Sequence, residues 1–286
     1  MNSPVPHASN VDQAAYWNGP GGRHWIDRQE MQDQLLAPVA AYLLKAAAAA
    51  PGDYVIDVGC GCGATTLEVA RVTGASGRAL GVDISGPMVA RAKERAAAEH
   101  SPAQFLVADA TIEDLSGEAA DLMISRFGVM FFADPALSFA NMRKALKPTG
   151  RLVFACWREP RLNPWLMLPL KAATQHAPPL PKLGPEDPGP FSFADETRVR
   201  RILSSAGFVD VTLEPVDLEL DTAVGQGFDN AVASALEIGP ASRALEGQPD
   251  DVRAAATAEI RAALAPFERG DQVLMGAAIW IVSARA

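Results

Sequence analysis

Residues 55–70 read VIDVGCGCGATTLEVA, an apolar run followed by three glycines in five positions and then by helical spacing. The run at 54–58 is β-branched and largely apolar, which is typical of a strand buried in a parallel sheet. A glycine-rich turn between such a strand and a helix places backbone N–H groups and a helix N-terminus at the carboxyl edge of the sheet. We therefore expect a ligand to lie against the backbone of this turn.

The alternation of strands and helices continues to residue 157, which predicts a parallel sheet with helices on both faces and right-handed crossovers. Further strands are predicted at 79–83, 104–109, 120–125 and 151–157. Ser85 and Asp134 are suited to begin two of the intervening helices. Pro148 and Gly150 are expected to end the helix that Asp134 begins.

The pattern then changes. Residues 158–194 hold an apolar helix candidate and, further on, six prolines within thirteen residues, which predicts a roof helix and an extended loop. Two alternating strands at 209–221 and 272–285 are joined by a helical insertion at 222–268, so we expect an antiparallel edge that carries a lid. The insertion is expected to hold at least two helices, the first of which ends at Gly239.

Residues 1–50 begin with a polar segment that is followed by one or two predicted helices. We therefore divide the chain into an N-terminal helical cap at 1–50 and a main domain at 51–286. The formal net charge of −9 arises from 25 basic and 34 acidic residues, and no block of Lys or Arg interrupts that acidity. A nucleic-acid partner is therefore not expected.

Targeting features and cysteine usage favour a cytoplasmic protein. The most apolar stretch, 40–51, is too short to span a bilayer and contains Lys45, and the N-terminus lacks the pattern of a signal peptide. The three cysteines, Cys60, Cys62 and Cys156, cannot form a disulfide framework, and no second Cys/His pair has ligand spacing for zinc. We expect neither a membrane partner nor a metal.

Three aspartates follow or end successive predicted strands. Asp57 lies two residues before Gly59, Asp83 lies 24 residues after that glycine, and Asp109 lies 26 residues after Asp83. Each alone is as readily explained as a strand-end or capping aspartate. Together they are suited to accept hydrogen bonds from two ribose hydroxyls and from an adenine amino group. The glycines alone, with Ala64, fit the dinucleotide fingerprint equally well.

Four stretches resemble a class I S-adenosylmethionine-dependent methyltransferase: VIDVGCGCGATTLEVA, LGVDISGPMVARAKERA, FLVADAT and SRFGVMFFADPALSFANMRKALKPTGRLVF. The most similar subgroup is that of the bacterial ubiquinone/menaquinone-biosynthesis C-methyltransferases, and the resemblance is strong over 53–157. It implies a Rossmann-like, doubly wound α/β fold whose seven-stranded sheet is mostly parallel with an antiparallel last strand. It also implies S-adenosylmethionine as cofactor, S-adenosylhomocysteine as product and a small-molecule methyl acceptor.

The resemblance further implies which residues contact the cofactor. They are Asp57, Gly59, Cys60 and Gly61 at the methionine end, Asp83, Ile84 and Met88 at the ribose and one adenine face, Asp109 and Ala110 at the adenine, and Ser125 and Arg126 near the methionyl group. Arg126 could instead pair with a carboxylate of the core. Asp57 suits a ligand with an ammonium and a sulfonium and would repel a pyrophosphate, which favours methyl transfer over hydride transfer.

The methyl acceptor is expected to bind between the N-terminal segment 16–30 and the lid insertion at 222–268. The residues expected to contact the acceptor are Tyr16, Trp17, Trp25, Phe127, Met130 and Trp157. The first three, which lie in the N-terminal segment, could equally be aromatic side chains that anchor the cap in the core. His24 is the candidate general base, and it could equally be a surface or packing histidine.

These residues predict in-line displacement of the methyl group onto a small aromatic or amphipathic acceptor. Catalysis would come mainly from orientation, which contributes about 7–11 kcal/mol in favourable cases, and from exclusion of water. Two alternatives remain open: an NAD(P)-dependent oxidoreductase that uses the same loop, and a non-catalytic protein of this fold that binds a partner.

Overall fold

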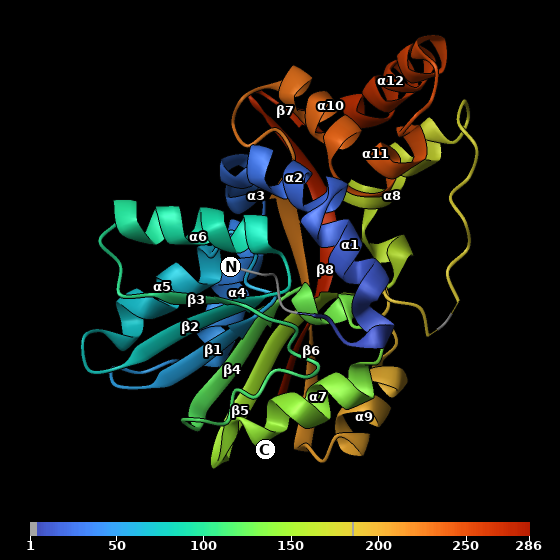
Figure 1. Ribbon diagram of the computed structural model, residues 1–286. Helices are drawn as coiled ribbons and strands as arrows, with labels where there is room; N and C mark the ends of the chain where they lie inside the picture. The colour runs from blue at the N-terminus through green and yellow to red at the C-terminus, as the bar shows by residue number, and fades with distance from the viewer. Residues whose placement is uncertain (1–4, 185) are drawn as a thin grey trace.

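The computed structural model describes residues 5–184 and 186–286, and its centre is one mixed sheet (Figure 1). The strands lie in the order β3-β2-β1-β4-β5-β8-β6, and the short β7 pairs only with β8. Their bounds are β1 Tyr54–Val58, β2 Arg78–Asp83, β3 Gln104–Val107, β4 Ala120–Arg126, β5 Leu146–Trp157, β6 Val209–Asp221, β7 Glu268–Arg269 and β8 Gln272–Arg285. Strands β1 to β5 are parallel, and β8 runs antiparallel to both β5 and β6. The predicted mostly parallel sheet with an antiparallel last strand is confirmed.

β1 lies at the centre of the parallel part and is buried along its whole length. Val55 pairs with Ala79 of β2 on one side and with Leu122 of β4 on the other. The chain order reverses at this strand, because β2 and β3 extend to one side and β4 and β5 to the other. Loops that follow β1 and β4 therefore diverge at the carboxyl edge, where open α/β sheets bind their ligands.

Helices flank the sheet in two groups. Helix α4 (Ala37–Ala47) packs on β4, β5 and β8 and touches α5 (Ala64–Thr73), whereas α7 (Pro135–Lys144) and α9 (Glu196–Ser205) form a separate pair against β5 and β6. Helix α6 (Gly86–Ala98) covers β2 and β3. Ser85 caps α6 and Asp134 caps α7 through side-chain oxygens that accept backbone N–H bonds, as their residue types predict.

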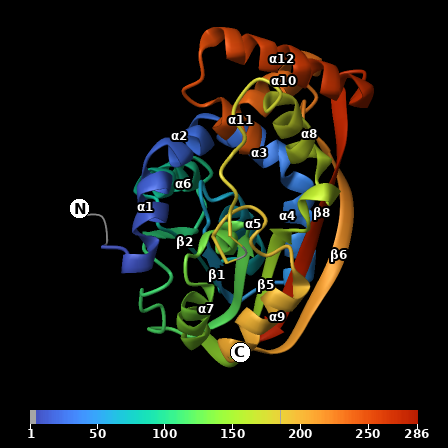
Figure 2. The same cartoon turned by 90° about the vertical axis from the view of Figure 1, so that its right-hand side faces the viewer.

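Two helical units cover the carboxyl edge (Figures 1 and 2). The cap contains the 3-10 turn η1 (Ala8–Asn10) and the helices α1 (Val11–Asn18), α2 (Pro20–Asp27) and α3 (Gln29–Leu35). The lid contains α8 (Pro164–Ala173), α10 (Phe228–Glu237), α11 (Gly239–Leu245) and α12 (Asp250–Leu264). Arg28 of the cap pairs with Glu237 of the lid, so the two units meet. No helix within 5–184 and 186–286 combines the length and apolarity needed to cross a membrane.

Several element boundaries differ from the sequence prediction. Residues 5–50 form four helices rather than one or two, because Pro20 occupies the first position of α2, where its missing N–H costs nothing. The first helix of the insertion, α10, ends at Glu237, close to the predicted end at Gly239, and Gly239, with a φ of +79°, is the first residue of a further helix, α11. Helix α7 ends at Lys144, before Pro148 and Gly150, because the chain enters β5 at Leu146. Residues 1–4 of the predicted cap and residue 185 of the predicted loop lie outside the described residues.

The proline-rich connector is fixed to the loop that follows β4. The Gly189 N–H and the Ser192 hydroxyl both donate to the Met130 carbonyl, and the buried Arg198 donates to the Ser192 carbonyl. The indole N–H of Trp280 on β8 donates to the Ala194 carbonyl at 3.0 Å. These bonds explain how a stretch without regular structure holds one position on the surface.

The start of the lid depends on one buried amide. Asn163 is fully buried; its Nδ2 donates to the carbonyls of Arg158, Glu159 and Ala278, and its Oδ1 accepts from the Ala278 N–H at 3.0 Å. The side chain thereby joins the chain before α8 to the backbone of β8. Its loss would leave several backbone groups without partners in a dry environment.

We predict that Asn163→Ala lowers the free energy of unfolding by about 2–4 kcal/mol, because it removes a network of buried hydrogen bonds. Urea unfolding followed by circular dichroism measures this loss. Asn230→Ala is the matched control, because its half-buried amide makes one bond, to the Ala223 carbonyl, and should cost less than about 1.5 kcal/mol. Equal losses in the two variants would contradict this role of Asn163.

Candidate active site

A cavity of about 1030 Å³, measured out to its open mouth, lies at the carboxyl edge beneath the cap. Its walls come from the glycine loop after β1, the ends of β2 and β4, the loops after β3 and β4, and helices α1 to α3. The predicted cofactor residues among its lining are Gly59, Cys60, Gly61, Asp83, Ile84, Met88, Asp109, Ala110 and Arg126. Asp57 and Ser125 are buried behind this wall.

The glycine loop is tight because two backbones meet there. A side chain on Gly59 would lie 2.6 Å from the Cα atom of Gly128, so the loops after β1 and β4 touch at two residues that lack Cβ atoms. Gly59 and Gly61 also adopt positive φ angles of +68° and +56°. Both constraints favour glycine, and they leave main-chain atoms facing the cavity.

Asp83 sits at the end of β2 with both carboxylate oxygens oriented by backbone donors. Oδ2 accepts from the Gly61 N–H and Oδ1 from the Ser85 N–H, each at 2.8 Å. Burial raises the pKa of this carboxyl group to about 6, although the two backbone bonds oppose the shift. Each oxygen keeps one lone pair, and the pair of oxygens matches the two hydroxyls of a ribose.

Asp109 lies after β3 and is almost fully buried. Its Oδ1 accepts from the Thr111 N–H and from the Asn10 side-chain amide, and its Oδ2 accepts from the His7 N–H, each at 2.9 Å. Two of these three donors come from the N-terminal cap. The carboxylate therefore lines the cavity and also fastens the cap over it.

Asp57 lies beneath the glycine loop instead of in the wall. Its Oδ2 accepts from the hydroxyls of Thr65 at 2.6 Å and Thr66 at 2.7 Å, while its buried Oδ1 has no partner among the described residues. Burial raises the pKa of this carboxyl group, and the threonine bonds and the nearby Arg126 counteract that rise. An unpaired carboxylate oxygen so close to the cavity makes the local potential favourable to a cation.

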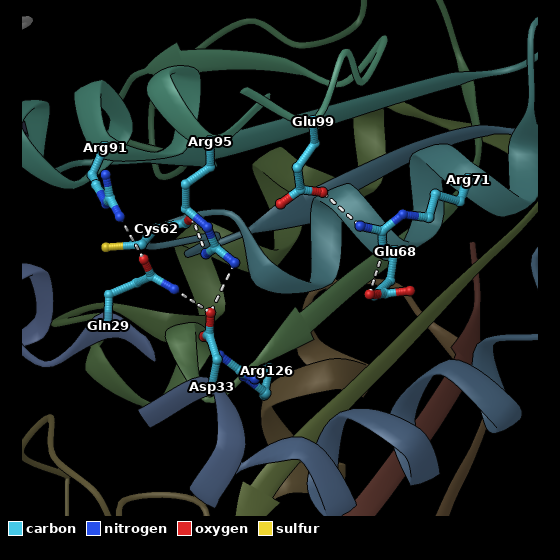
Figure 3. Close-up of polar contacts among 9 residues, drawn as sticks. All are labelled: Gln29, Asp33, Cys62, Glu68, Arg71, Arg91, Arg95, Glu99 and Arg126. Carbon is cyan, nitrogen blue, oxygen red and sulfur yellow. Dashed lines mark hydrogen bonds and ion pairs between the residues drawn. The ribbon is translucent and has the colours of Figure 1, made fainter. Parts of the chain in front are cut away.

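A charged network fills the end of the cavity beside the cap (Figure 3). Asp33 of α3 accepts from Gln29 at 2.6 Å and pairs with Arg95 of α6 at 2.9 Å, and its other oxygen lies 3.8 Å from Arg126. Arg95 also donates to the Cys62 carbonyl in the glycine loop. Burial lowers the pKa of Arg126, whereas Asp33 and Asp57 oppose that change. Arg126 therefore pairs with a carboxylate and also lines the cavity, and its contact with the cofactor stays a prediction.

Aromatic side chains form much of the remaining wall. Of the predicted acceptor residues, Trp17, Trp25 and Phe127 line the cavity. Phe131 and Phe132 line it too, and Trp17 packs edge-on against Phe131 with ring centroids 5.0 Å apart.

The other predicted acceptor and catalytic residues lie outside the lining. Trp157 stacks on the rear of Phe127 at 4.2 Å between centroids, Met130 is buried, and Tyr16 is 39% exposed. His24 is exposed on α2, whose inward-facing aromatic residue is Trp25. The geometry therefore gives the proposed base no contact with the cavity.

Sequence reasoning missed four of the N-terminal residues that face the cavity, namely Asn10, Gln13, Gln29 and Asp33. Gln13 of α1 lies at helical spacing from Asn10, the last residue of η1, and from the predicted Trp17, and Gln29 and Asp33 lie one helical turn apart on α3. This spacing is the signal that could have found them. That signal is obscured by Pro20 and the three glycines at 19–22, which suggest a loop.

The cysteines act as neutral, buried side chains. Cys60, Cys62 and Cys156 are free, and burial raises the pKa of the Cys62 thiol to about 12. Among the described residues, no group of three or more His, Cys, Asp or Glu side chains is arranged to hold a metal ion.

Comparison with known proteins gives a family match for part of the chain. Residues 55–150 match the family described as "Methyltransferase domain". The 2-phytyl-1,4-naphtoquinone methyltransferase of Trichormus variabilis is 30% identical over 119 residues, which are 41% of this chain and 52% of that protein. The nocamycin O-methyltransferase of Saccharothrix syringae is 29% identical over 196 residues, which are 65% of this chain and 70% of that protein.

Among solved structures, the YcgJ protein of Bacillus subtilis shares the fold, with a TM-score of 0.56 at 15% identity over 86% of this chain and 97% of its own. The chain spans between 30% and 52% of the length of the first three curated relatives that it matches. The family match covers the glycine loop and the strand ends that carry Asp83 and Asp109. The match over residues 55–150 and the methyltransferases among the relatives support a class I S-adenosylmethionine-dependent methyltransferase domain.

Proposed function

We propose that this protein transfers a methyl group from S-adenosylmethionine to a small aromatic acceptor. The arrangement of Asp83 and Asp109 in one cavity with the glycine loop carries the proposal. Both side chains are hydrogen-bond acceptors held by backbone donors, and a nucleoside presents matching donors, namely two ribose hydroxyls and an adenine amino group. The family match supports the same cofactor.

The opposite end of the cavity suits the charges of a methionyl group. Asp57 and Asp33 favour the ammonium and sulfonium, and Arg126 lies between these two carboxylates, where it is suited to the methionine carboxylate. A pyrophosphate placed against the glycine loop would be repelled by Asp57 beneath it, whose buried Oδ1 has no partner among the described residues. This electrostatic pattern favours a methyl donor over a nicotinamide dinucleotide.

The bound cofactor would supply an activated methyl group on a positively charged sulfur. The chain's own task is to align the acceptor and to exclude water, which fits a site roofed by helices. Phe127, Phe131 and Trp25 offer flat apolar surfaces for a planar acceptor. His24 stays a prediction that the geometry does not support, because it lies outside this wall.

The charges in the cavity further restrict the class of acceptor that can bind. Among the described residues, Arg126 is the only Lys or Arg side chain in the lining, and it already pairs with Asp33. An acceptor that carries a phosphate group would therefore lack a free cation to bind. An uncharged aromatic acceptor fits better, and the name of one relative, the 2-phytyl-1,4-naphtoquinone methyltransferase, indicates an aromatic ring system in the acceptor of that protein.

We predict that the protein methylates phenols or reduced naphthoquinones and leaves phosphoethanolamine unmodified, because only the former match an aromatic wall without free cations. Transfer of radiolabel from methyl-labelled S-adenosylmethionine to an acceptor panel measures this preference. Trp25→Ala should lower kcat/KM for the aromatic acceptor about tenfold through lost contact area. Methylation of phosphoethanolamine alone would contradict the proposed acceptor class.

We also predict that S-adenosylhomocysteine binds with full affinity above pH 6 and more weakly below it. Ribose hydroxyls donate to the ionised form of Asp83, whose pKa in the free protein is about 6. Ligand binding therefore competes with protonation, and the affinity falls by up to about tenfold per pH unit below that value. Calorimetric titrations from about pH 7.5 to about pH 5 measure the slope.

Asp83→Asn is the control for this titration, because an amide does not change charge over the range. Its affinity should be lower at every pH and should not vary between about pH 7.5 and about pH 5. The same slope in Asp83→Asn as in the unmodified protein would assign the titration to another group and contradict the prediction.

A further inference from the structure

The N-terminal cap contributes one side chain directly to the nucleoside end of the cavity. Asn10 is 3% exposed, and its Nδ2 donates to Asp109 Oδ1 at 2.9 Å and to Thr111 Oγ1 at 2.8 Å. Its Oδ1 accepts from the Ala133 N–H at 3.2 Å. Because both amide ends have matching partners, the orientation of the Asn10 side chain is fixed by the network.

The helix that follows Asn10 holds its place mainly through polar contacts. None of the residues of α1 is buried, and its C-terminal end is joined to the turn after β2 through polar bonds. There the Ser85 hydroxyl donates to the Trp17 carbonyl, and Asn18 exchanges bonds with the Ile84 carbonyl and the Gly86 N–H. Helix α1 is thus joined to the two turns that follow Asp109 and Asp83, the residues predicted to bind the adenine and the ribose.

The lone pairs of Asp109 show what Asn10 does there. Oδ1 already accepts from Asn10 and Thr111, which uses both of its lone pairs. Oδ2 accepts from the His7 N–H and keeps one lone pair. Since Asp109 lines the cavity, this remaining acceptor site is the one available to a ligand.

We propose that Asn10 is a positioning residue for recognition of the 6-amino group of adenine. The proposal rests on the proposed function, because it takes the nucleoside of S-adenosylmethionine as the ligand. The Asn10 amide occupies Oδ1 and fixes the carboxylate plane, so that the free lone pair of Oδ2 is presented to the amino group. The cap thereby takes part in choosing a 6-aminopurine over a 6-oxopurine, whose carbonyl oxygen would face a carboxylate oxygen.

The test compares S-adenosylhomocysteine with its deaminated analogue S-inosylhomocysteine, which differs at position 6 of the purine. We expect the unmodified protein to prefer the adenosyl ligand by about 10- to 100-fold, which corresponds to one hydrogen bond to a charged acceptor. Asn10→Ala should reduce this ratio about tenfold, mainly through weaker binding of the adenosyl ligand. Calorimetry of both ligands gives the two affinities.

Two further variants separate positioning from general loosening of the cap. Asn18→Ala removes the other amide that joins α1 to the domain, at the turn after β2, so it should weaken both ligands equally and leave the ratio unchanged. Asp109→Asn should abolish the preference, and adding Asn10→Ala to it should not change the ratio further, because both residues act through one carboxylate.

Each outcome decides between the proposals. If Asn10→Ala weakens both ligands equally, or if the unmodified protein binds S-adenosylhomocysteine without preferring it, the role of Asn10 is refuted and the proposed function stands. If the unmodified protein binds neither nucleoside, the proposed function fails and the role of Asn10 fails with it.

Discussion

The close contact between Gly59 and Gly128 is the constraint on which the site depends. Their Cα atoms meet where the chain order of the sheet reverses, so the loops after β1 and β4 leave the sheet in different directions from one point. A Cβ atom at either glycine would force these loops apart. The space above the contact becomes a cavity into which the ends of β2 and β4 and the loop after β3 all point.

The buried carboxylates around this cavity have distinct surroundings, and these differences give each a separate role. Asp83 is held by two backbone donors, Asp109 by the cap, and Asp57 by two threonine hydroxyls beneath the loop. Asp33 joins them from α3 and forms ion pairs with Arg95 and Arg126. In the proposed binding mode, acceptor oxygens face the nucleoside end and mixed charges face the methionyl end, which gives the ligand one favourable orientation.

Local patterns in the sequence predicted the sheet, the lid and most of the proposed cofactor wall. The glycine spacing and the aspartates at the strand ends are short-range signals, and Asp83 and Asp109 indeed line one cavity. Asn10 could not be predicted, because its contact with Asp109 spans 99 residues of sequence and depends on how the cap folds back. His24 and Trp25 are adjacent, and only the three-dimensional packing of α2 decides which of them faces inward. Phe131 and Phe132 also line the cavity without having been predicted, because the 3-10 turn after β4 sets the direction of their side chains.

A crystal structure grown with both S-adenosylhomocysteine and NADP is the most direct test of whether the sulfonium nucleoside S-adenosylmethionine and its thioether product, rather than a dinucleotide, bind against the glycine loop. Our account predicts electron density for S-adenosylhomocysteine alone, with its ribose hydroxyls within hydrogen-bonding distance of Asp83 and its amino group facing Asp109. A dinucleotide in the cavity, with its pyrophosphate against the turn at Gly59, would contradict the account.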